Sequence, residues 1–352
     1  MRFRAPGRVN LIGDHTDYNE GFVLPAAIEL ACVIDFQPRG DGVVSLRSDD
    51  LPGTVELRAD GSTEPSRVEP GWGRYAAGVV RTLAELGRPP GGLEGTLVSS
   101  VPLGAGLSSS AALEVAVALA LCDAAGFERG VLELAEACRR AEEIATGVPC
   151  GIMDQLASLA GRRDHALLID CRSLAIEHVP IPPSLAVLVV HSGVSRALAG
   201  SAYADRRRAC EEAAARLGLR SLRDATPEQV ADDPLARHVV SENERVVAAA
   251  RALREGDEEA LGPLLLASHA SLRDDFRVST SALDALVDEL VDAGALGARL
   301  TGAGFGGSVV ALARQDEAAA ILETATTRYR GETGHLPHGF ICRAAAGAAR
   351  LE

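Results

Sequence analysis

The chain has 352 residues, of which 47% are hydrophobic but only 3% aromatic, so its cores are expected to consist of Ala, Val and Leu. The formal net charge of −14 disfavours nucleic acid and anionic membranes as partners, so any site for a polyanion must be positive locally. All 35 basic residues are Arg, which excludes a P-loop lysine and a Schiff-base lysine.

No apolar run has the length of a membrane span, and the N-terminal segment lacks the apolar core of a signal peptide. The seven cysteines show no CxxC spacing, so we expect reduced structural thiols and a cytoplasmic protein. A cysteine-ligated zinc site is not expected. The oligomeric state stays open between a monomer and a homodimer.

The first 50 residues are predicted to form short strands on either side of a polar loop, with the strands at Val9–Ile12, Phe22–Pro25 and Ile28–Phe36. Arg8 lies on the first strand and, taken alone, is more typical of a surface charge. The loop GDHTDYNEG clusters donors and acceptors that suit a polyhydroxyl ligand, and a solvated hairpin tip is the alternative. Its polar side chains are Asp14, His15, Asp17, Tyr18 and Asn19.

Residues 51–70 are polar and rich in Gly and Pro, which predicts a surface excursion. A helix is predicted over Gly71–Gly87, where Trp72 and Tyr75 are three positions apart and would share one face. Core filling is the ordinary role of such a pair, and stacking on a nucleotide base is the alternative. A strand over Leu93–Val101 then leads into a glycine-rich segment.

The stretch PLGAGLSSSAALEVAVALALCDAAG at 102–126 combines a glycine turn with a helix start. Residues 104–106 are small and let a ligand approach the backbone closely. The Ala/Leu run after Ser110 has no helix breaker before Gly126, so serines 108–110 are predicted at a helix N-terminus. Free N–H groups, the helix dipole and the hydroxyls there suit a phosphate and its magnesium ion. We interpret the stretch as a phosphate cradle, with a Ser-capped helix as the alternative.

Residues 131–146, VLELAEACRRAEEIAT, have an apolar stripe at helical spacing that includes a carboxylate. Glu142 lies within the stripe, four residues after Cys138 and three before Ala145, whereas Glu143 lies opposite. An inward carboxylate is costly unless it is paired or binds a cation. Glu142 is therefore interpreted either as a magnesium ligand or as the partner of a buried Arg.

The segment GVPCGIMDQLASLAG at 147–161 predicts a loop and then a short helix, with Asp154 near the helix start and off its apolar stripe. Acidic residues are common there because the helix dipole favours them. An ionised carboxylate at this place is also what a base needs to activate a hydroxyl.

After a strand at Ala166–Asp170, the prolines of Ser173–Ser184 indicate a boundary, so we divide the chain near residue 180 into domains 1–180 and 181–352. The second domain begins with a strand at Leu185–His191, followed by a helix with Tyr203 and several amphipathic helices between 225 and 293. ARLTGAGFGGSVVALA then predicts strand, glycine loop and strand. Its GxGxxG at 302–307 is a weak match to a dinucleotide fingerprint, which opens a helix.

Together these motifs are similar to those of galactokinases, which belong to the GHMP superfamily of small-molecule kinases. GRVNLIGDHTDYNEGFVLP resembles the N-terminal galactokinase signature, and GVPCGIMDQ and SGVSRALAGSAYADRR also look galactokinase-like. PLGAGLSSSAA and LTGAGFGGSVVAL resemble motifs shared across the superfamily. The likeness spans nearly the whole chain in the expected order.

The resemblance implies an α+β chain of two domains with the active site in the cleft between them. It implies ATP- and magnesium-dependent phosphorylation of the anomeric C1 hydroxyl of D-galactose, with Asp154 as the base and Arg8 positioning that hydroxyl. The residues implied to hold the sugar are Asp14, His15, Asp17, Gly151 and Tyr203. Those implied to hold the nucleotide and its magnesium are Gly104, Ala105, Gly106, Leu107, Ser108, Ser109 and Ser110 around the phosphates, Trp72 and Tyr75 at adenine, and Ser110 with Glu142 on the metal.

One departure from the family pattern is Asp14, where Glu is more usual, and it bears on sugar selectivity. Two other functions fit similar motifs. A related sugar 1-kinase for N-acetylgalactosamine or L-arabinose would keep the same machinery around a different pocket. A non-catalytic galactose sensor would bind both ligands without turnover, and the presence of Asp154, Arg8 and the SSSAA run argues against it.

Overall fold

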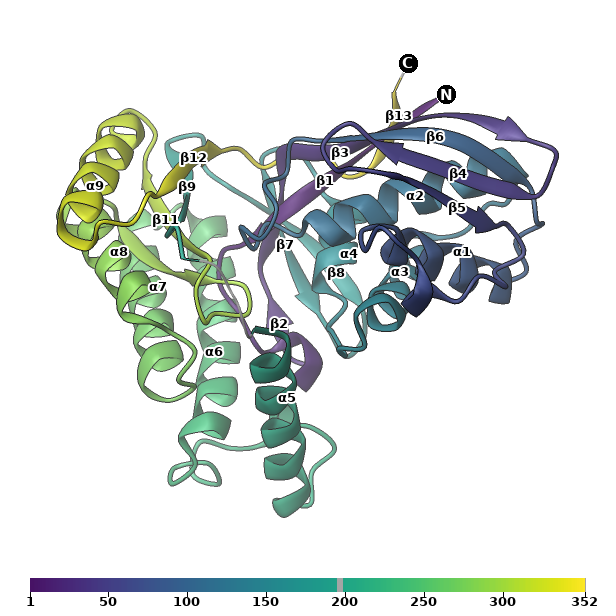
Figure 1. Ribbon diagram of the computed structural model, residues 1–352. Coiled ribbons are helices and arrows are strands. Elements are labelled where there is room, and N and C mark those ends of the chain that lie inside the picture. The colour runs from purple at the N-terminus through teal and green to yellow at the C-terminus, as the bar shows by residue number, and fades with distance from the viewer. Residues whose placement is uncertain (195–198, 352) are drawn as a thin grey trace.

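The computed structural model describes residues 1–194 and 199–351, whose strands form three sheets. The largest sheet has the order β13-β1-β3-β6-β4-β5, and its neighbours are antiparallel except for β4 and β6. Its strands are β1 (Arg2–Asn10), β3 (Pro25–Arg39), β4 (Val43–Ser48), β5 (Thr54–Arg58), β6 (Gly92–Ser99) and β13 (Ala349–Leu351). Figure 1 shows this sheet at the upper right, above a group of helices.

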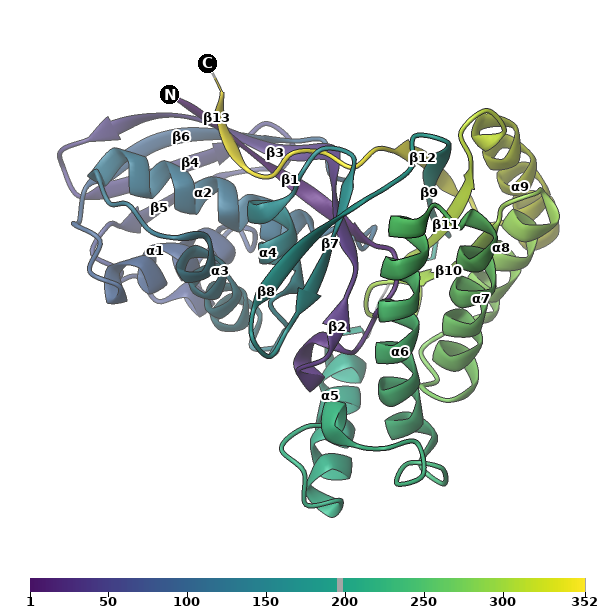
Figure 2. The ribbon, with the colours of Figure 1, turned by 180° about the vertical axis from the view of Figure 1, so that it is seen from behind.

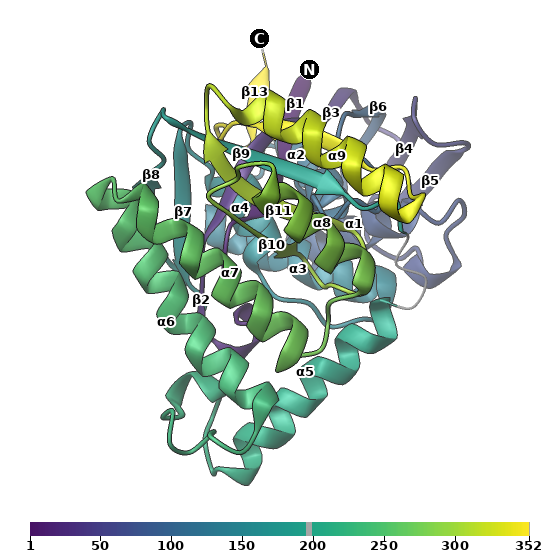
Figure 3. The same ribbon diagram turned by 90° about the vertical axis from the view of Figure 1, so that its left-hand side faces the viewer.

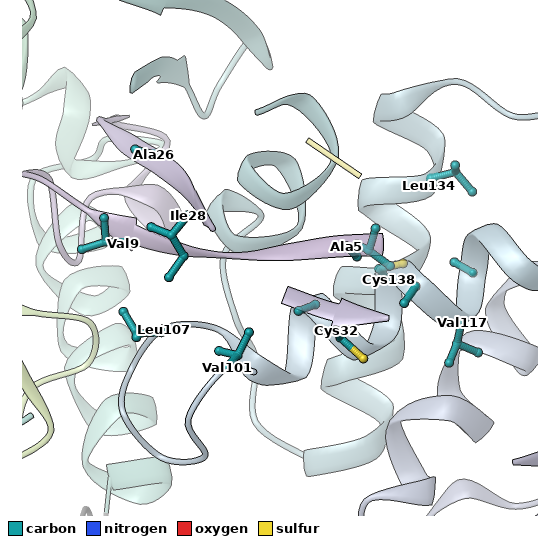
Figure 4. Close-up of a cluster of buried hydrophobic side chains, with 14 of the residues drawn as sticks. Ala5, Val9, Ala26, Ile28, Cys32, Val101, Leu107, Val117, Leu134 and Cys138 are labelled. Atoms are coloured by element: carbon teal, nitrogen blue, oxygen red, sulfur yellow. The ribbon is translucent and has the colours of Figure 1, made fainter. Parts of the chain in front are cut away.

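Those helices cover one face of the sheet and enclose a core of small side chains. They are α1 (Gly73–Glu85), α2 (Ser109–Ala125), α3 (Val131–Thr146) and α4 (Met153–Ala160). Helix α2 packs against β1, β3, α1 and α3, and apart from Glu114 its buried residues are Ala, Val, Leu and Cys. Figure 4 shows part of this core, where Ala5 of β1, Cys32 of β3 and Cys138 of α3 lie close together. Close packing of small residues thus replaces the missing aromatics.

A second sheet, in the order β10-β11-β9-β12, is antiparallel throughout. Its strands are β9 (Leu185–His191), β10 (Gly297–Thr301), β11 (Ser308–Arg314) and β12 (His338–Cys342). The accompanying helices are α5 (Ala199–Arg216), α6 (Pro234–Glu255), α7 (Glu258–Asp274), α8 (Ser281–Asp292) and α9 (Ala318–Thr333), of which Figure 3 shows α7, α8 and α9 over one face of the sheet.

Strand β9 joins the two halves of the molecule through packing. Its side chains alternate, so that Val187 and Val189 belong to the hydrophobic cluster that includes the core of the first half, while Leu188 and Val190 belong to a separate cluster within the second half. A strand buried on both faces needs the continuous apolar run that LAVLVV provides. The second sheet is therefore covered on both sides.

Two further connections cross between the halves. The small sheet β2-β7-β8, formed by β2 (Phe22–Val23), β7 (His165–Asp170) and β8 (Ala175–Pro180), lies beside α6 (Figure 2). Strand β13 returns the end of the chain to β1, so the two termini lie together (Figure 1). The domain division near residue 180 stays a prediction, although residues 349–351 pack with the first half.

Two segments, one expected to be a surface excursion and the other a domain boundary, contain strands that the sequence analysis did not predict. The expected surface excursion at 51–70 includes β5, in which Val55 and Leu57 are buried while their neighbours are exposed. That alternation is the ordinary pattern of a half-buried strand, and the flanking glycines and prolines obscured it. The proline-rich boundary Ser173–Ser184 includes β8, because Pro180 ends the strand rather than interrupting it.

Several other elements agree closely with the predictions, but the strand expected at Val9–Ile12 shares only residues 9 and 10 with β1, which spans Arg2–Asn10. Helix α3 covers 131–146 as predicted, β9 covers 185–191, and α2 ends at Ala125 before Gly126. The glycine loop after β10 leads into strand β11, so the structural context of a dinucleotide fingerprint is missing at this loop. All seven cysteines are free. No helix in the described part of the chain combines the length and apolarity needed to cross a bilayer.

Candidate active site

A cavity of about 290 Å³ brings together segments from both halves of the chain. It contains most of the predicted site residues, together with Cys150, Met153, Gly302 and Ala303. The predicted residues that line it are Arg8, Asp14, His15, Asp17, Gly104, Gly106, Ser108, Ser109, Ser110, Glu142, Gly151, Asp154 and Tyr203. Those that do not line it are Trp72, Tyr75, Ala105 and Leu107.

Asp154 and Arg8 face each other at the centre of this cavity. Arg8 lies on β1, and its Nε and Nη2 donate to the two oxygens of Asp154 at 2.7 and 2.8 Å. Such a bidentate pair fixes the orientation of a carboxylate. Ser108 Oγ donates a further short hydrogen bond to Asp154 Oδ2. Arg8 is buried, whereas the Asp154 side chain keeps 24% exposure, so the carboxylate remains open to a ligand.

The glycine-serine loop before α2 is connected directly to Arg8. Arg8 Nη1 donates to the carbonyl of Gly106 at 2.6 Å, and the Arg8 N–H donates to the carbonyl of Leu107 at 3.1 Å. Ser108 adopts a left-handed backbone conformation with φ of 58°, immediately before helix α2 begins at Ser109. The helix N-terminus therefore opens into the cavity as predicted. The side chains of Ala105 and Leu107 point instead into the core, where both are nearly fully buried.

Glu142 lies at the edge of the same cavity without an arginine partner among its hydrogen bonds in the described chain. Ser110 Oγ donates to Glu142 Oε1 at 2.7 Å, and Gln155 Nε2 donates to Glu142 Oε2 at 2.8 Å. Burial and the nearby Asp154 raise the pKa of Glu142. The arginine alternative from the sequence therefore does not describe this carboxylate.

The loop after β1 is anchored by a residue that the sequence analysis missed. Arg299 of β10 is fully buried, and its Nη2 forms a short ion pair with Asp14 Oδ2. Asp14 Oδ1 accepts from the Gly302 N–H at 3.0 Å. The signal available in the sequence was a single charge inside the apolar segment ARLTGAGFGG.

Asp17 packs so closely against Gly151 that a side chain at position 151 would displace the Asp17 carboxylate. A Cβ at position 151 would lie 1.6 Å from Asp17 Oδ2. Burial, together with the nearby Asp154, raises the pKa of Asp17 to about 6. The glycine thus allows two carboxylates to approach the same small space.

His15 and Tyr203 also line the cavity that contains Asp154. Burial lowers the pKa of His15 to about 3, so the imidazole is neutral. Its Nε2 lies 3.3 Å from the Ala303 carbonyl, which can only accept, so Nε2 carries the proton and Nδ1 accepts from the Tyr18 hydroxyl at 2.9 Å. The ring of Tyr203 in α5 packs against that of His15 at a tilt of 37°, with ring centroids 5.6 Å apart. Residues 195–198, part of the segment that resembled galactokinases, lie outside the described residues.

Trp72 and Tyr75 do not line the cavity. Trp72 is the N-cap residue of α1, and its Nε1 donates to the Pro52 carbonyl at 3.2 Å. Tyr75 is half-buried, and burial with the nearby Glu142 raises its pKa. Their role at adenine stays a prediction.

Comparison with known proteins gives a consistent result. Residues 1–38 match the galactokinase galactose-binding signature, residues 74–162 the GHMP kinase N-terminal domain, and residues 249–331 the GHMP kinase C-terminal domain. The chain is 45% identical to the galactokinase of Roseiflexus sp. (strain RS-1) over 363 residues, covering 99% of this chain and 92% of that protein. It is 46% identical to the galactokinase of Bos taurus, with coverage of 99% and 91%. The chain belongs to the galactokinase family.

Solved structures agree with this assignment. The crystal structure of Lactococcus lactis galactokinase complexed with galactose has a TM-score of 0.93 and 34% identity, covering 99% of this chain and 95% of that one. The Methanococcus jannaschii mevalonate kinase has a TM-score of 0.72 at 20% identity, covering 98% of each chain, which is a likeness of fold alone. The predicted α+β GHMP kinase fold is confirmed. Members of the galactokinase family are phosphotransferases with an alcohol group as acceptor, and so is this chain.

Proposed function

We propose that this member of the galactokinase family transfers the terminal phosphoryl group of ATP to the C1 hydroxyl of D-galactose, giving galactose 1-phosphate and ADP. The observation that carries the proposal is the position of Asp154. It lies between the polar loop of residues 14–17 and the N-terminus of α2, where it faces the buried Arg8. The likeness to a galactokinase complexed with galactose supports the choice of sugar.

Asp154 acts in this proposal as the base for the acceptor hydroxyl. As the C1 oxygen bonds to phosphorus and the bond to ADP breaks, the hydroxyl proton passes to the Asp154 carboxylate. A positioned base of this kind contributes about 10²–10⁴ in rate. Arg8 holds the carboxylate in place through its two hydrogen bonds and offers positive charge to the developing negative charge of the transfer.

In this proposal, polar side chains that line the cavity hold the sugar. Asp17 and the buried Asp14 supply acceptors, while Tyr203 supplies a hydroxyl that burial keeps protonated by raising its pKa. Gly151 has no side chain, so it leaves room for Asp17 and can offer only its backbone to the sugar. This arrangement of fixed donors and acceptors suits a ligand with many hydroxyls.

The ATP phosphates are expected at the N-terminus of α2, held by the backbone of 104–110. Ser110 and Glu142 are oxygen donors 2.7 Å apart at the cavity, which fits a magnesium ion that takes one or two protein ligands and completes its shell with phosphates and water. When bound there, magnesium would neutralise phosphate charge. The absence of lysine is no obstacle, since backbone N–H groups, Arg8 and the metal supply the positive charge.

The test is the release of ADP with ATP and magnesium across a panel of sugars. We expect turnover with D-galactose to exceed that with N-acetylgalactosamine and L-arabinose. Faster turnover with either of those sugars would reassign the substrate within the same chemistry. Binding of galactose without turnover of any sugar would favour a sensor and contradict the proposal.

A further inference from the structure

The first turn of α4 carries two adjacent polar side chains that form hydrogen bonds with different residues. Asp154 points to Arg8 and the cavity, whereas Gln155 is fully buried behind it. Gln155 Nε2 donates to Glu142 Oε2 at 2.8 Å and to Glu114 Oε2 at 3.0 Å. An ionised Glu142 can only accept, so the nitrogen rather than the oxygen of the amide faces it. The amide thus links α2, α3 and α4.

We propose that Gln155 is a positioning residue for Glu142, and that Glu114 holds the Gln155 amide in the orientation that this requires. The inference rests on the proposed function, because it takes Glu142 as a magnesium ligand. Ser110 holds one oxygen of Glu142 at 2.7 Å and Gln155 holds the other at 2.8 Å. Outer hydrogen bonds of this kind orient a carboxylate before it meets a metal.

Glu114 is suited to this task because it can accept a hydrogen bond without adding charge. It is the one charged residue among the buried positions of α2, and it is fully buried. No Arg or His side chain is hydrogen-bonded to it among the described residues. Burial, reinforced by Glu142, raises the pKa of Glu114 well above its usual range, which favours its neutral form. The neutral form adds no second negative charge beside Glu142.

A contribution to stability alone does not explain why Gln155 and Glu114 are both polar. Gln155 Oε1 and Glu114 Oε1 both lack a hydrogen-bond partner among the described residues. Buried polar atoms without partners destabilise a protein, and an apolar pair of similar size would avoid that loss. In the described structure, the two bonds of Nε2 are the ones that fix the Gln155 amide, and one of them ends on Glu142.

The experiment measures binding of Mn²⁺ with a non-hydrolysable ATP analogue by electron paramagnetic resonance, alongside galactose affinity by calorimetry. Gln155→Met keeps the volume and removes the donor, so we expect Mn²⁺ binding to weaken by about 10–100-fold while galactose affinity changes less than about twofold. Glu114→Gln preserves a neutral acceptor and should bind Mn²⁺ like the wild type. Glu114→Leu should approach Gln155→Met.

Gln155→Glu serves where Gln155→Met fails to fold, because it keeps the shape and replaces the donor with an acceptor. Wild-type Mn²⁺ affinity in either Gln155 variant would overturn the inference, as would equal losses of metal and sugar binding, which indicate general loosening. Glu142→Ala separates the two proposals. If it weakens Mn²⁺ binding and the Gln155 variants do not, this inference alone is wrong. If Glu142→Ala leaves Mn²⁺ affinity unchanged, the metal assignment in the proposed function is itself wrong.

Discussion

At the scale of single residues, the site depends on one partly exposed carboxylate held by a buried arginine. Removing Asp154 altogether would leave Arg8 buried without its partner, which is costly in itself. Asparagine keeps an acceptor oxygen for Arg8 and removes the base. The isosteric substitution Asp154→Asn is therefore more informative than removal of the side chain.

For Asp154→Asn, we expect kcat to fall by about 10²–10⁴ while the dissociation constant for galactose changes little, since the base acts on the acceptor proton and not on ground-state binding. Steady-state assays and calorimetry measure the two quantities. Asp123→Asn, which removes a carboxylate from an exposed pair with Arg350, is the control and should leave both unchanged. Near-wild-type kcat in Asp154→Asn would remove this residue from the mechanism.

The raised pKa of Asp17 predicts that galactose affinity depends on pH. Its pKa is raised to about 6, so as the pH falls through 6 the folded protein takes up a proton there that the unfolded chain takes up only near pH 4. Protonation removes a charged acceptor, so galactose affinity should fall below about pH 6. The folded state is stabilised by the same proton uptake as the pH falls from about 6 to about 4.

Calorimetric titration with galactose between pH 5 and about 8 checks this prediction. The Asp17→Asn variant should bind more weakly, lose the transition near pH 6, and gain thermal stability above it because a buried charge is gone. His15 serves as an internal control, since its pKa of about 3 keeps it neutral across this range. An unchanged transition in Asp17→Asn would assign it to another group.

At the scale of elements, two loops that are distant in the chain pack against each other at Gly151 and Asp17. Gly151, in the loop before α4, lies under Asp17, in the loop after β1. Helix α4 starts two residues after Gly151, so a displacement of this loop also moves Asp154. The sugar loop and the base are thus mechanically linked.

Gly151→Ala should therefore weaken galactose binding by at least about tenfold and lower stability by about 1–3 kcal/mol, because a Cβ at 1.6 Å from Asp17 Oδ2 forces the Asp17 carboxylate, or the loop that carries it, out of place. Calorimetry and urea unfolding measure the two effects. Gly91→Ala is the matched control, since nothing lies within 4 Å of its Cβ position. Wild-type galactose affinity in Gly151→Ala would show that the two loops are not packed as described.

At the scale of the whole molecule, a buried polar network connects the two halves behind the sugar loop. Besides Asp14, Arg299 contacts the carbonyls of Asn10 and Leu11, both at 3.2 Å, and donates to Ser268 Oγ at 3.1 Å. Ser268 in turn donates to Glu242 at 2.6 Å, and that carboxylate accepts from the Gly13 N–H at 2.9 Å. Strands and helices of the second half therefore hold both ends of residues 10–14.

A double-mutant cycle tests this network. Arg299→Met and Asp14→Asn should each lower the free energy of unfolding by about 3–5 kcal/mol, since each leaves a buried charge unpaired. The double variant should lose less than the sum, because the two charges disappear together. Arg216→Met, from an exposed pair with Asp233, should change stability by less than about 0.5 kcal/mol. Additive losses in urea unfolding would contradict a coupled pair.

Local patterns were sufficient for much of this molecule. Helical periodicity placed α3 and the inward Glu142, the glycine turn placed the start of α2, and the apolar run 185–191 became β9. These predictions succeeded because propensity, capping and periodicity act over a few neighbouring residues. The motifs that resemble those of galactokinases predicted most of the residues that line the cavity for the same reason, since each motif is a short continuous segment.

Other features depended on partners far apart in the chain. Arg299 and Asp14 are 285 positions apart, Gln155 and Glu114 are 41 apart, and β13 pairs with β1 across nearly the whole sequence. A charge in an apolar segment shows that a partner is needed but not which one, because the chain can bring many candidates to the same place. The sequence by itself determined most of the elements and the chemistry of the motifs they carry. Only the tertiary structure decided which buried charges meet, since burial removes water as the alternative partner and leaves that choice to packing.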